Sequence, residues 1–193
     1  MIWVLVVPAY FLGTFPSAVM VARSKGVDIT KVGSGNPGAS NIARQFGTAW
    51  GVVVFVLDAL KGALPALAGL LIDDRPLTLA MVAAAVVGHM FPATRGFKGG
   101  KGVATMGGAT LVLQPLVFLI LLALWFVTRK LSGIASVGSL AIALGLPVLT
   151  AIIGAPWWEV TSLALIAALV MVRHTSNIKR LLSGSELSAS RSR

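Results

Sequence analysis

The stretch VATMGGATLVLQPLVFLILLALWFVT, Val103 to Thr128, decides how often this chain crosses a membrane. It is long enough for one span, but Gln114 and Pro115 interrupt it near the middle. Proline disfavours a straight helix, and glutamine places a polar group at the break. Two halves of about 12 residues, roughly 18 Å each, would result. The stretch therefore predicts a helical hairpin, with one or both halves short or re-entrant.

The distribution of positive charge favours the hairpin over a single crossing. Short cytoplasmic loops carry an excess of Lys and Arg. A hairpin places both of its ends inside, together with the basic loops 23–47 and 94–102 and the basic tail. A single crossing would instead put Arg129, Lys130 and that tail outside. We therefore expect the N-terminus outside and the C-terminus in the cytoplasm.

The hydropathy pattern predicts an all-α polytopic membrane protein with seven helical transmembrane segments. Met1–Ala22 is read as a retained span, because no basic segment precedes it and no convincing cleavage site follows. We expect a single membrane domain over residues 1–193, with a disordered tail after about residue 186. The remaining predicted segments are Thr48–Ile72, Leu77–Ala93, the two halves of 103–128, Ile134–Ile153 and Trp157–Val172.

The composition excludes several classes of protein. Of 193 residues, 56% are hydrophobic and 11% are charged, so most of the surface must face lipid. The net charge of +10 sits in short loops, which is typical of charges that face the cytoplasm and anionic lipid rather than nucleic acid. With no cysteine, two histidines and six scattered acidic residues, we expect no disulfide and no metal site.

The loop VGSGNPGASNIAR, residues 32–44, is rich in glycine and polar residues and has no acid. Asn36 and Pro37 read as the N-cap and first residue of a short helix that ends at Gly47. Free N–H groups at a helix start favour an anion, so this loop is a candidate phosphate site. The alternative is a plain interhelical loop. At helical spacing, Ser40, Asn41 and Arg44 fall on roughly one face of this short helix.

The loop RGFKGGKGVAT, residues 95–105, superficially resembles a P-loop. The pattern fails because Arg95 replaces its first glycine and Gly102 follows Lys101 where Ser or Thr should stand. No nearby acidic residue suggests a magnesium ligand, so phosphate binding is favoured over nucleotide hydrolysis. The alternative is a basic anchor loop, which would not need so many glycines.

The segment RHTSNIKRLLSGSE, residues 173–186, follows the last span. His174 and Asn177 are neighbours at i, i+3, and Arg180 lies one turn further. A polar site and an amphipathic helix on anionic lipid both explain the segment, although the second does not account for the His/Asn pair.

Polar residues inside the spans are read as structural. Asp58 and Lys61 are three residues apart within the second span and are expected to satisfy each other. His89, near the end of the third span, is expected to form hydrogen bonds at the helix end rather than act in catalysis.

Together the motifs SGNPGASN, GHMFP…GFKGGKGVAT and HTSNIKRLLSG, with LDALKG in the second span, resemble those of the bacterial membrane acyl-phosphate:glycerol-3-phosphate acyltransferases, the PlsY family. The resemblance covers essentially the whole chain. It implies transfer of a fatty acyl group from acyl phosphate to the 1-hydroxyl of sn-glycerol 3-phosphate. The products would be lysophosphatidic acid and inorganic phosphate, in the first step of phospholipid synthesis.

The resemblance also implies roles for individual residues. Backbone amides of the first motif would replace a metal in the pocket for acyl phosphate, formed by Ser34, Gly35, Asn36, Gly38, Ser40 and Asn41. The candidate catalytic residues, which would hold glycerol 3-phosphate with help from Ser136, are Arg44, Lys101, His174 and Asn177. The second loop would be shaped by Lys98, Gly99, Gly100 and Gly102. Supporting roles would fall to Arg180 and Glu186.

The identity of the base that takes the hydroxyl proton stays open. The base could be His174 or the phosphate of the acceptor, and the cations around His174 favour the phosphate because they oppose a further positive charge. No cofactor, nucleic acid or obligate protein partner is expected, and membrane lipid is. The expected location is the bacterial inner membrane, with the site at the cytoplasmic face. Alternatives are a small carrier for phosphorylated metabolites and a lipid-binding scaffold.

Overall fold

The computed structural model describes residues 2–188, and every regular element in that range is a helix, as predicted. The chain forms two compact units, which are described separately: residues up to Leu113 and residues from Gln114 onward. The expectation of a single domain stays a prediction. Residues 189–193 of the predicted disordered tail lie outside the described residues.

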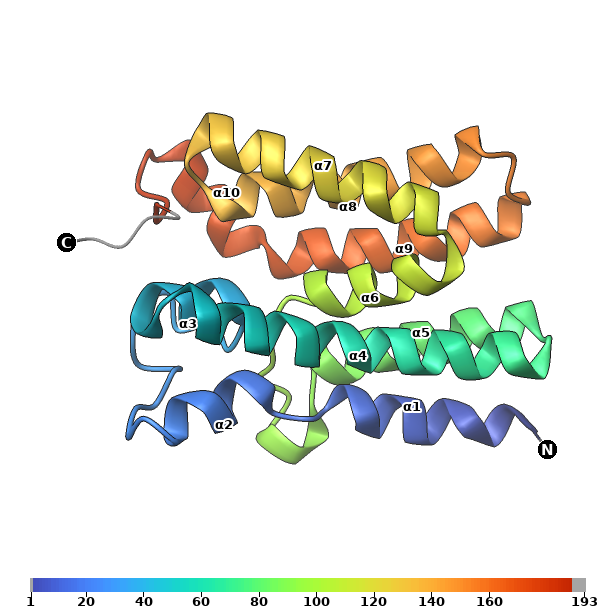
Figure 1. The fold of residues 1–193 in the computed structure, drawn as a ribbon, viewed down its shortest axis with the longest axis horizontal. Helices are drawn as coiled ribbons and strands as arrows, with labels where there is room; N and C mark the ends of the chain where they lie inside the picture. Colours follow the sequence, from blue (N-terminus) through green and yellow to red (C-terminus); the bar gives the residue numbers. More distant parts are fainter. Residues whose placement is uncertain (1, 189–193) are drawn as a thin grey trace. The chain divides into compact units, whose positions relative to one another are not determined.

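The first unit is built around helix α4, which packs against α3, α5 and α6, while α1 packs against α5 (Figure 1). A buried apolar cluster that includes Ile29, Ile42 and Val54 joins the first loop to α3 and α4. The elements of this unit are the 3-10 helix Ile2–Leu5, α1 Val6–Gly13, α2 Ser17–Arg23, α3 Ala39–Phe46, α4 Thr48–Ile72, α5 Arg75–Met90, the 3-10 helix Ala93–Arg95 and α6 Val103–Leu113.

The first predicted span is not one continuous helix. It breaks between α1 and α2, where Pro16 precedes the first residue of α2. Proline has no N–H to donate and its ring obstructs the preceding turn, so the helix stops and restarts. Ile2–Arg23 as a whole still has the length and composition of one membrane span. The break gives Ser17 a buried position at the start of α2.

Helices α4 and α6 approach closely at two glycines. A Cβ added at Gly62 of α4 would collide with the backbone oxygen of Thr105, and one at Gly108 of α6 with the backbone oxygen of Ala59. Small residues let membrane helices bring their backbones together in this way. The contact fixes α6, and therefore the loop that precedes it, against α4.

The second unit contains α7 Pro115–Ser132, α8 Ala135–Ile152, α9 Trp157–Arg173 and α10 Thr175–Leu182. Helix α8 packs against both α7 and α9 (Figure 1). The axes of α9 and α10 differ by 56° at His174. This bend turns the polar residues of α10 away from the direction of the apolar helix before it.

The predicted break at Gln114 and Pro115 is confirmed, because α6 ends at Leu113 and α7 begins at Pro115. The Gln114 side chain donates to Glu159 Oε1 at 2.9 Å and accepts from Thr150 Oγ1 at 2.9 Å. All three residues are buried. The polar side chain that interrupts the apolar stretch therefore finds its hydrogen-bond partners inside the second unit.

The lengths of the two halves differ from the prediction. Helix α6 has 11 residues, but α7 has 18, because the helix continues through Arg129 and Lys130 to Ser132 and ends at Gly133 with φ of 69°. Only α6 is short. Among the described residues, five helices are long and apolar enough to cross a membrane, or six if α9 and α10 form one bent span.

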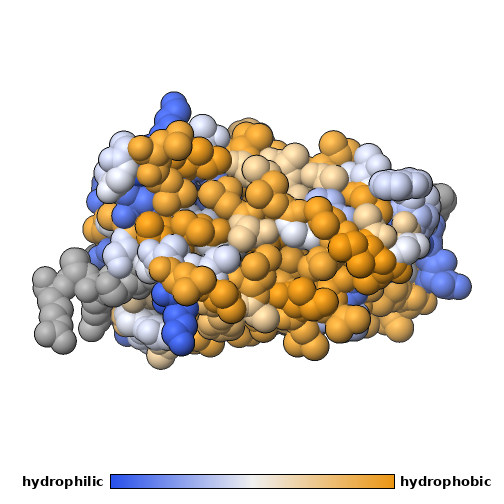
Figure 2. Space-filling model, turned by 90° about the horizontal axis from the view of Figure 1, so that it is seen from above, coloured by the Kyte–Doolittle hydropathy of each residue, from blue (hydrophilic) through white to orange (hydrophobic). Residues whose placement is uncertain are grey.

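Large apolar side chains cover much of the exposed surface. Figure 2 shows them over the middle of one face, with hydrophilic side chains towards its two ends. On α7, Leu116, Leu119 and Phe126 are all more than half exposed. Such a surface would be unstable in water and is suited to lipid.

Candidate functional site

The first loop is organised by the buried side chain of Asn41, which is 1% exposed. Its Oδ1 accepts from the Ser34 amide at 3.2 Å. Its Nδ2 donates to the carbonyls of Val32 at 3.0 Å and Ile29 at 3.4 Å. Asn41, which was expected to line the pocket, thus holds the loop in shape from a buried position. Its neighbour on α3, Ser40, is exposed.

The start of α3 corrects the expected cap. Gly38, not Asn36, is the N-cap, and its backbone is extended with φ of −150°. Asn36 and Pro37 lie in the loop before it, while Gly47 ends the helix as expected. Asparagine is a good N-cap, but the helix begins two residues later than this preference predicts, and a Cβ at Gly38 would meet the Asn36 side chain.

Several amides of the first loop donate within the loop. The amide of Gly35, which has φ of 67°, reaches Val32 O at 3.0 Å, and the Asn36 amide reaches Ser34 Oγ at 3.4 Å. These two amides and that of Ser34 all donate to acceptors of the same motif. That backbone amides of this motif replace a metal stays a prediction. The first-turn amides of α3, at Ala39 and Ser40, belong to the groups that a helix leaves without intrahelical acceptors.

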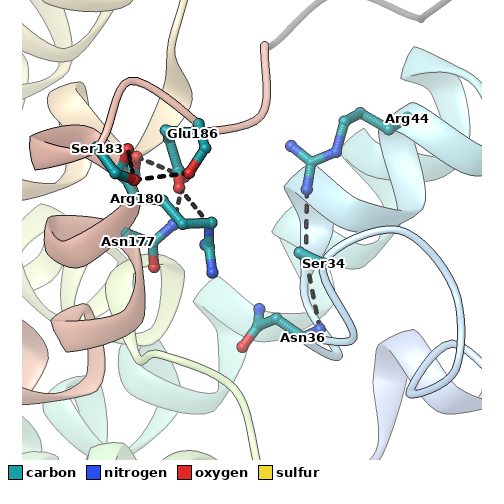
Figure 3. Close-up of polar contacts among 9 residues, drawn as sticks. Ser34, Asn36, Arg44, Asn177, Arg180, Ser183 and Glu186 are labelled. Carbon is teal, nitrogen blue, oxygen red and sulfur yellow. Dashed lines mark hydrogen bonds and ion pairs between the residues drawn. The ribbon is translucent and has the colours of Figure 1, made fainter.

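Arg44 lies over the loop from the last turn of α3. Its Nη2 donates to Ser34 Oγ at 3.3 Å, and Figure 3 shows the chain of contacts from Arg44 through Ser34 to Asn36. A guanidinium is always charged and presents several donors, which suits a phosphate. The structure thus places together four of the residues predicted for the first motif: Ser34, Asn36, Asn41 and Arg44.

The second loop is fastened to the end of α5. The Gly99 amide donates to Met90 O at 3.1 Å and the Gly100 amide to His89 O at 3.0 Å. A Cβ at either glycine would collide with α5, and Gly102 has φ of 81°. The glycines predicted to shape this loop therefore have a steric reason to be glycine. Lys98 is exposed and Lys101 half-buried.

In the second unit Glu186 is the centre of a polar cluster (Figure 3). Its Oε1 accepts from Ser136 Oγ at 2.9 Å and from Asn177 Nδ2 at 2.5 Å, and its Oε2 accepts from Arg180 Nε at 2.6 Å. Burial opposes ionisation of the carboxyl, but these hydrogen bonds outweigh burial and lower the pKa of Glu186 below its ordinary value. The family resemblance implied only a supporting role for Glu186, and its partner Ser136 lies 50 residues away in sequence, beyond the reach of a local motif.

His174 is buried at 2% exposure at the junction of α9 and α10. Its Nδ1 lies 2.8 Å from Val170 O. A carbonyl only accepts, so this contact assigns the hydrogen to Nδ1 and fixes the ring. Asn177 is also buried, one turn further along, at 5% exposure.

Within residues 2–188, no group of three or more metal-ligating side chains is arranged to hold a metal ion. What each unit offers is polar and cationic. The first presents Arg44 and Lys101, and the second presents His174, Asn177 and Arg180. Such groups can bind phosphates and position a hydroxyl.

Comparison with known proteins agrees with this chemistry. The glycerol-3-phosphate acyltransferase family model matches residues 3–184. A glycerol-3-phosphate acyltransferase from Solidesulfovibrio magneticus is 44% identical over 181 residues, which cover 93% of this chain and 90% of that protein. One from Aquifex aeolicus is 40% identical over 185 residues, covering 94% and 96%.

Two solved structures are also similar to this chain. Both are crystal structures of PlsY (YgiH), an integral membrane glycerol 3-phosphate acyltransferase. The glycerol 3-phosphate form has a TM-score of 0.92 at 38% identity, and the lysophosphatidic acid form 0.90 at 37%. Each comparison covers 95% of this chain and 93% of the other.

These comparisons confirm the prediction of an acyltransferase in an integral membrane fold, and they do not support a carrier or a scaffold. The match extends over nearly the whole chain, and the three polar motifs lie within it. The chain belongs to the glycerol-3-phosphate acyltransferase family.

Proposed function

We propose that this enzyme transfers a fatty acyl group from acyl phosphate to the 1-hydroxyl of sn-glycerol 3-phosphate. The hydroxyl oxygen bonds to the acyl carbon, and the bond from that carbon to the phosphate oxygen breaks. Inorganic phosphate leaves with the electron pair, and the hydroxyl proton passes to a base. The products are lysophosphatidic acid and inorganic phosphate.

The observation that carries the donor assignment is the Arg44–Ser34 contact above a loop fixed by Asn41. Arg44 supplies positive charge, and the first-turn amides of α3 add the positive end of a helix dipole. Both groups suit a phosphate that gains charge as it leaves. An acyl thioester would not place such a phosphate at its reacting carbon.

In this proposal Lys101, His174 and Asn177 position the acceptor. Arg44, which the family resemblance places with them, is assigned to the donor phosphate because of its contact with Ser34. Its own phosphate serves as the base, because a phosphate monoester with a second pKa near 6 is mostly dianionic at neutral pH. His174 would have to become cationic among Arg173, Lys179 and Arg180 to serve instead. His174 therefore orients the acceptor through its fixed ring rather than taking the proton.

We infer from the basic segments that the site lies at the cytoplasmic face of the bacterial inner membrane. The loops with Arg44 and Lys101 and the segment with Arg180 are the most basic parts of the chain. Lys and Arg are enriched on the cytoplasmic side of membrane proteins. Both substrates carry phosphate and would reach the site from the cytoplasm.

Purified enzyme tests the reaction directly. With acyl phosphate and glycerol 3-phosphate, lysophosphatidic acid and phosphate should form in equal amounts, and a chelator should leave the rate unchanged. Replacing acyl phosphate by the corresponding acyl thioester should stop the reaction. Turnover with the thioester would refute the donor assignment, and a chelator-induced loss restored by magnesium would reveal a metal site.

A further inference from the structure

Four buried polar side chains meet inside the first unit: Ser17 of α2, Asp58 and Lys61 of α4, and His89 of α5. None of them is more than 6% exposed. Lys61 Nζ lies 2.6 Å from Asp58 Oδ1, 3.2 Å from Ser17 Oγ and 3.4 Å from His89 Nδ1. Ser17 also donates to Asp58 Oδ1. We call these four residues the α4 network.

A contribution to stability alone does not explain the α4 network well. Taking an ion pair out of water costs several kcal/mol, and well-packed apolar residues often serve stability as well or better. Asp58 and Lys61 could also satisfy each other without His89 or Ser17. Polar residues inside a membrane helix usually serve a function.

The α4 network reaches the second loop through His89. The backbone oxygen of His89 accepts from the Gly100 amide at 3.0 Å, and that of Met90 accepts from the Gly99 amide at 3.1 Å. The imidazole of His89 also lies directly against Gly100, so that a Cβ there would meet three atoms of the ring. One residue thus holds the loop by its main chain and supports it by its side chain.

We propose that the α4 network is a positioning device for the loop 98–102, and through it for Lys101. The contacts of His89 Nδ1 with Lys61 and Asp58, at 3.4 and 3.7 Å, fix the ring from α4. The fixed ring limits how closely the backbone of Gly100 can approach α5. The position of Gly100 in turn determines where the backbone of Lys101, the next residue, lies. The functional part of this inference rests on the proposed role of Lys101 in binding the acceptor.

The first test measures the loop without measuring activity. The double variant Asp58→Asn/Lys61→Met removes both charges together, so that neither is left buried alone. Amide hydrogen exchange at Gly99 and Gly100 should become faster in this variant than in the native enzyme. Unchanged exchange would overturn the proposal.

Asp74→Ala is the matched control for exchange. Asp74 caps the opposite end of α5 through the Leu77 amide at 2.8 Å, about 22 Å along the helix from His89. Losing an N-cap destabilises a helix. The control should therefore lower Tm without accelerating exchange at Gly99 and Gly100. Equal acceleration would show general loosening of α5 and refute a specific link.

Kinetics then test the link to Lys101. The Asp58→Asn/Lys61→Met variant should lose about 10- to 100-fold in kcat/KM for glycerol 3-phosphate, as a displacement of about 1 Å costs up to about 100-fold. In a Lys101→Ala background the same pair of substitutions should cost less than about 3-fold, because groups that act as a unit are not additive. Losses that multiply would overturn the link.

Two further outcomes are separable from these. If Lys101→Ala alone keeps native activity, the proposed role of Lys101 is wrong, while the exchange measurement still decides whether the α4 network holds the loop. If the double variant does not fold, His89→Phe replaces it, since this change keeps a ring against Gly100 and removes the nitrogen that faces Lys61. Exchange at Gly99 and Gly100 should again be faster, and native exchange would overturn the proposal.

Discussion

At the scale of single residues, His174 is fixed by its Nδ1 contact with Val170 O and is buried, as a positioning residue should be. His174→Gln keeps a hydrogen-bonding side chain but cannot serve as a base. If the acceptor phosphate takes the proton, kcat at saturating acceptor should fall by less than about 10³-fold, whereas loss of a general base costs about 10²–10⁴-fold. A larger loss with unchanged acceptor binding would identify His174 as the base.

Glu186 predicts a pH dependence of stability. Its pKa is lowered in the folded chain, so the stabilisation is present above the ordinary value of 4.5 and is lost as the pH falls through the lower folded value. Glu186→Gln should cost about 1–3 kcal/mol at neutral pH, since glutamine keeps only one acceptor oxygen for the three donors and removes the negative charge that faces Arg180. Thermal unfolding from about pH 7 to about pH 3 should show the two proteins converging below pH 4.5. A constant difference would contradict this account.

At the scale of elements, the close crossing of α4 and α6 makes Gly108 sensitive to substitution. Its Cβ would collide with backbone of Ala59, which cannot move without moving α4. Gly108→Ala should therefore lower the free energy of unfolding by about 1–3 kcal/mol, as overpacking does. Activity should fall with it, because α6 follows the loop of Lys101 directly.

Gly145→Ala is the control for that measurement. Gly145 is also helical, in α8, but its Cβ would meet only the ends of two side chains, those of Leu121 at 2.9 Å and Leu124 at 3.6 Å, and the flexible end of a side chain can yield. Alanine favours a helix over glycine by about 1 kcal/mol. Tm should be unchanged or higher. A loss in Tm equal to that of Gly108→Ala would refute the argument from backbone contact.

The elements also show what sequence patterns could and could not predict. The break at Gln114 was predictable because it depends on two adjacent residues, a proline that interrupts the helix and a polar glutamine before it. The end of α7 was missed, since Arg129 and Lys130 look like loop residues although they occupy its last turns. The cap of α3 at Gly38 was missed because Asn36 is the better cap by intrinsic preference.

The candidate site was predictable to a similar degree. Motifs predict Ser34, Arg44 and Lys101 as site residues because glycine-rich and cationic loops have a local signature, and the structure brings two of them, Ser34 and Arg44, into contact. The role of Glu186 was not predictable in full, since its three partners are up to 50 residues away in sequence. The Asp58–Lys61 pair was predicted correctly, but its link to Gly100 through His89 depends on packing that no spacing rule describes.

At the scale of the whole molecule, the distribution of charge predicts the orientation in the membrane. The predicted hairpin would place the end of α7 on the cytoplasmic side with the tail and the loop of Lys101. The chain has no cysteine, so Arg129→Cys introduces a single thiol near that end. An impermeant thiol reagent should label it only after the membrane is opened. Labelling from outside in intact cells would refute the hairpin orientation.

The ion pair of Asp58 and Lys61 has a consequence for biosynthesis. Both partners belong to α4 and stand one helical turn apart, so they can neutralise each other as soon as this helix forms. The segment can then enter lipid with two charges but almost no net charge, before α5 and α6, which pack against it, have been synthesised. Gln114 and Glu159, by contrast, lie 45 residues apart in sequence and find each other only after α9 has been synthesised. The buried polar groups are therefore paired in the order in which their helices are synthesised. The charged pair, Asp58 and Lys61, can form within its own helix at the moment of insertion.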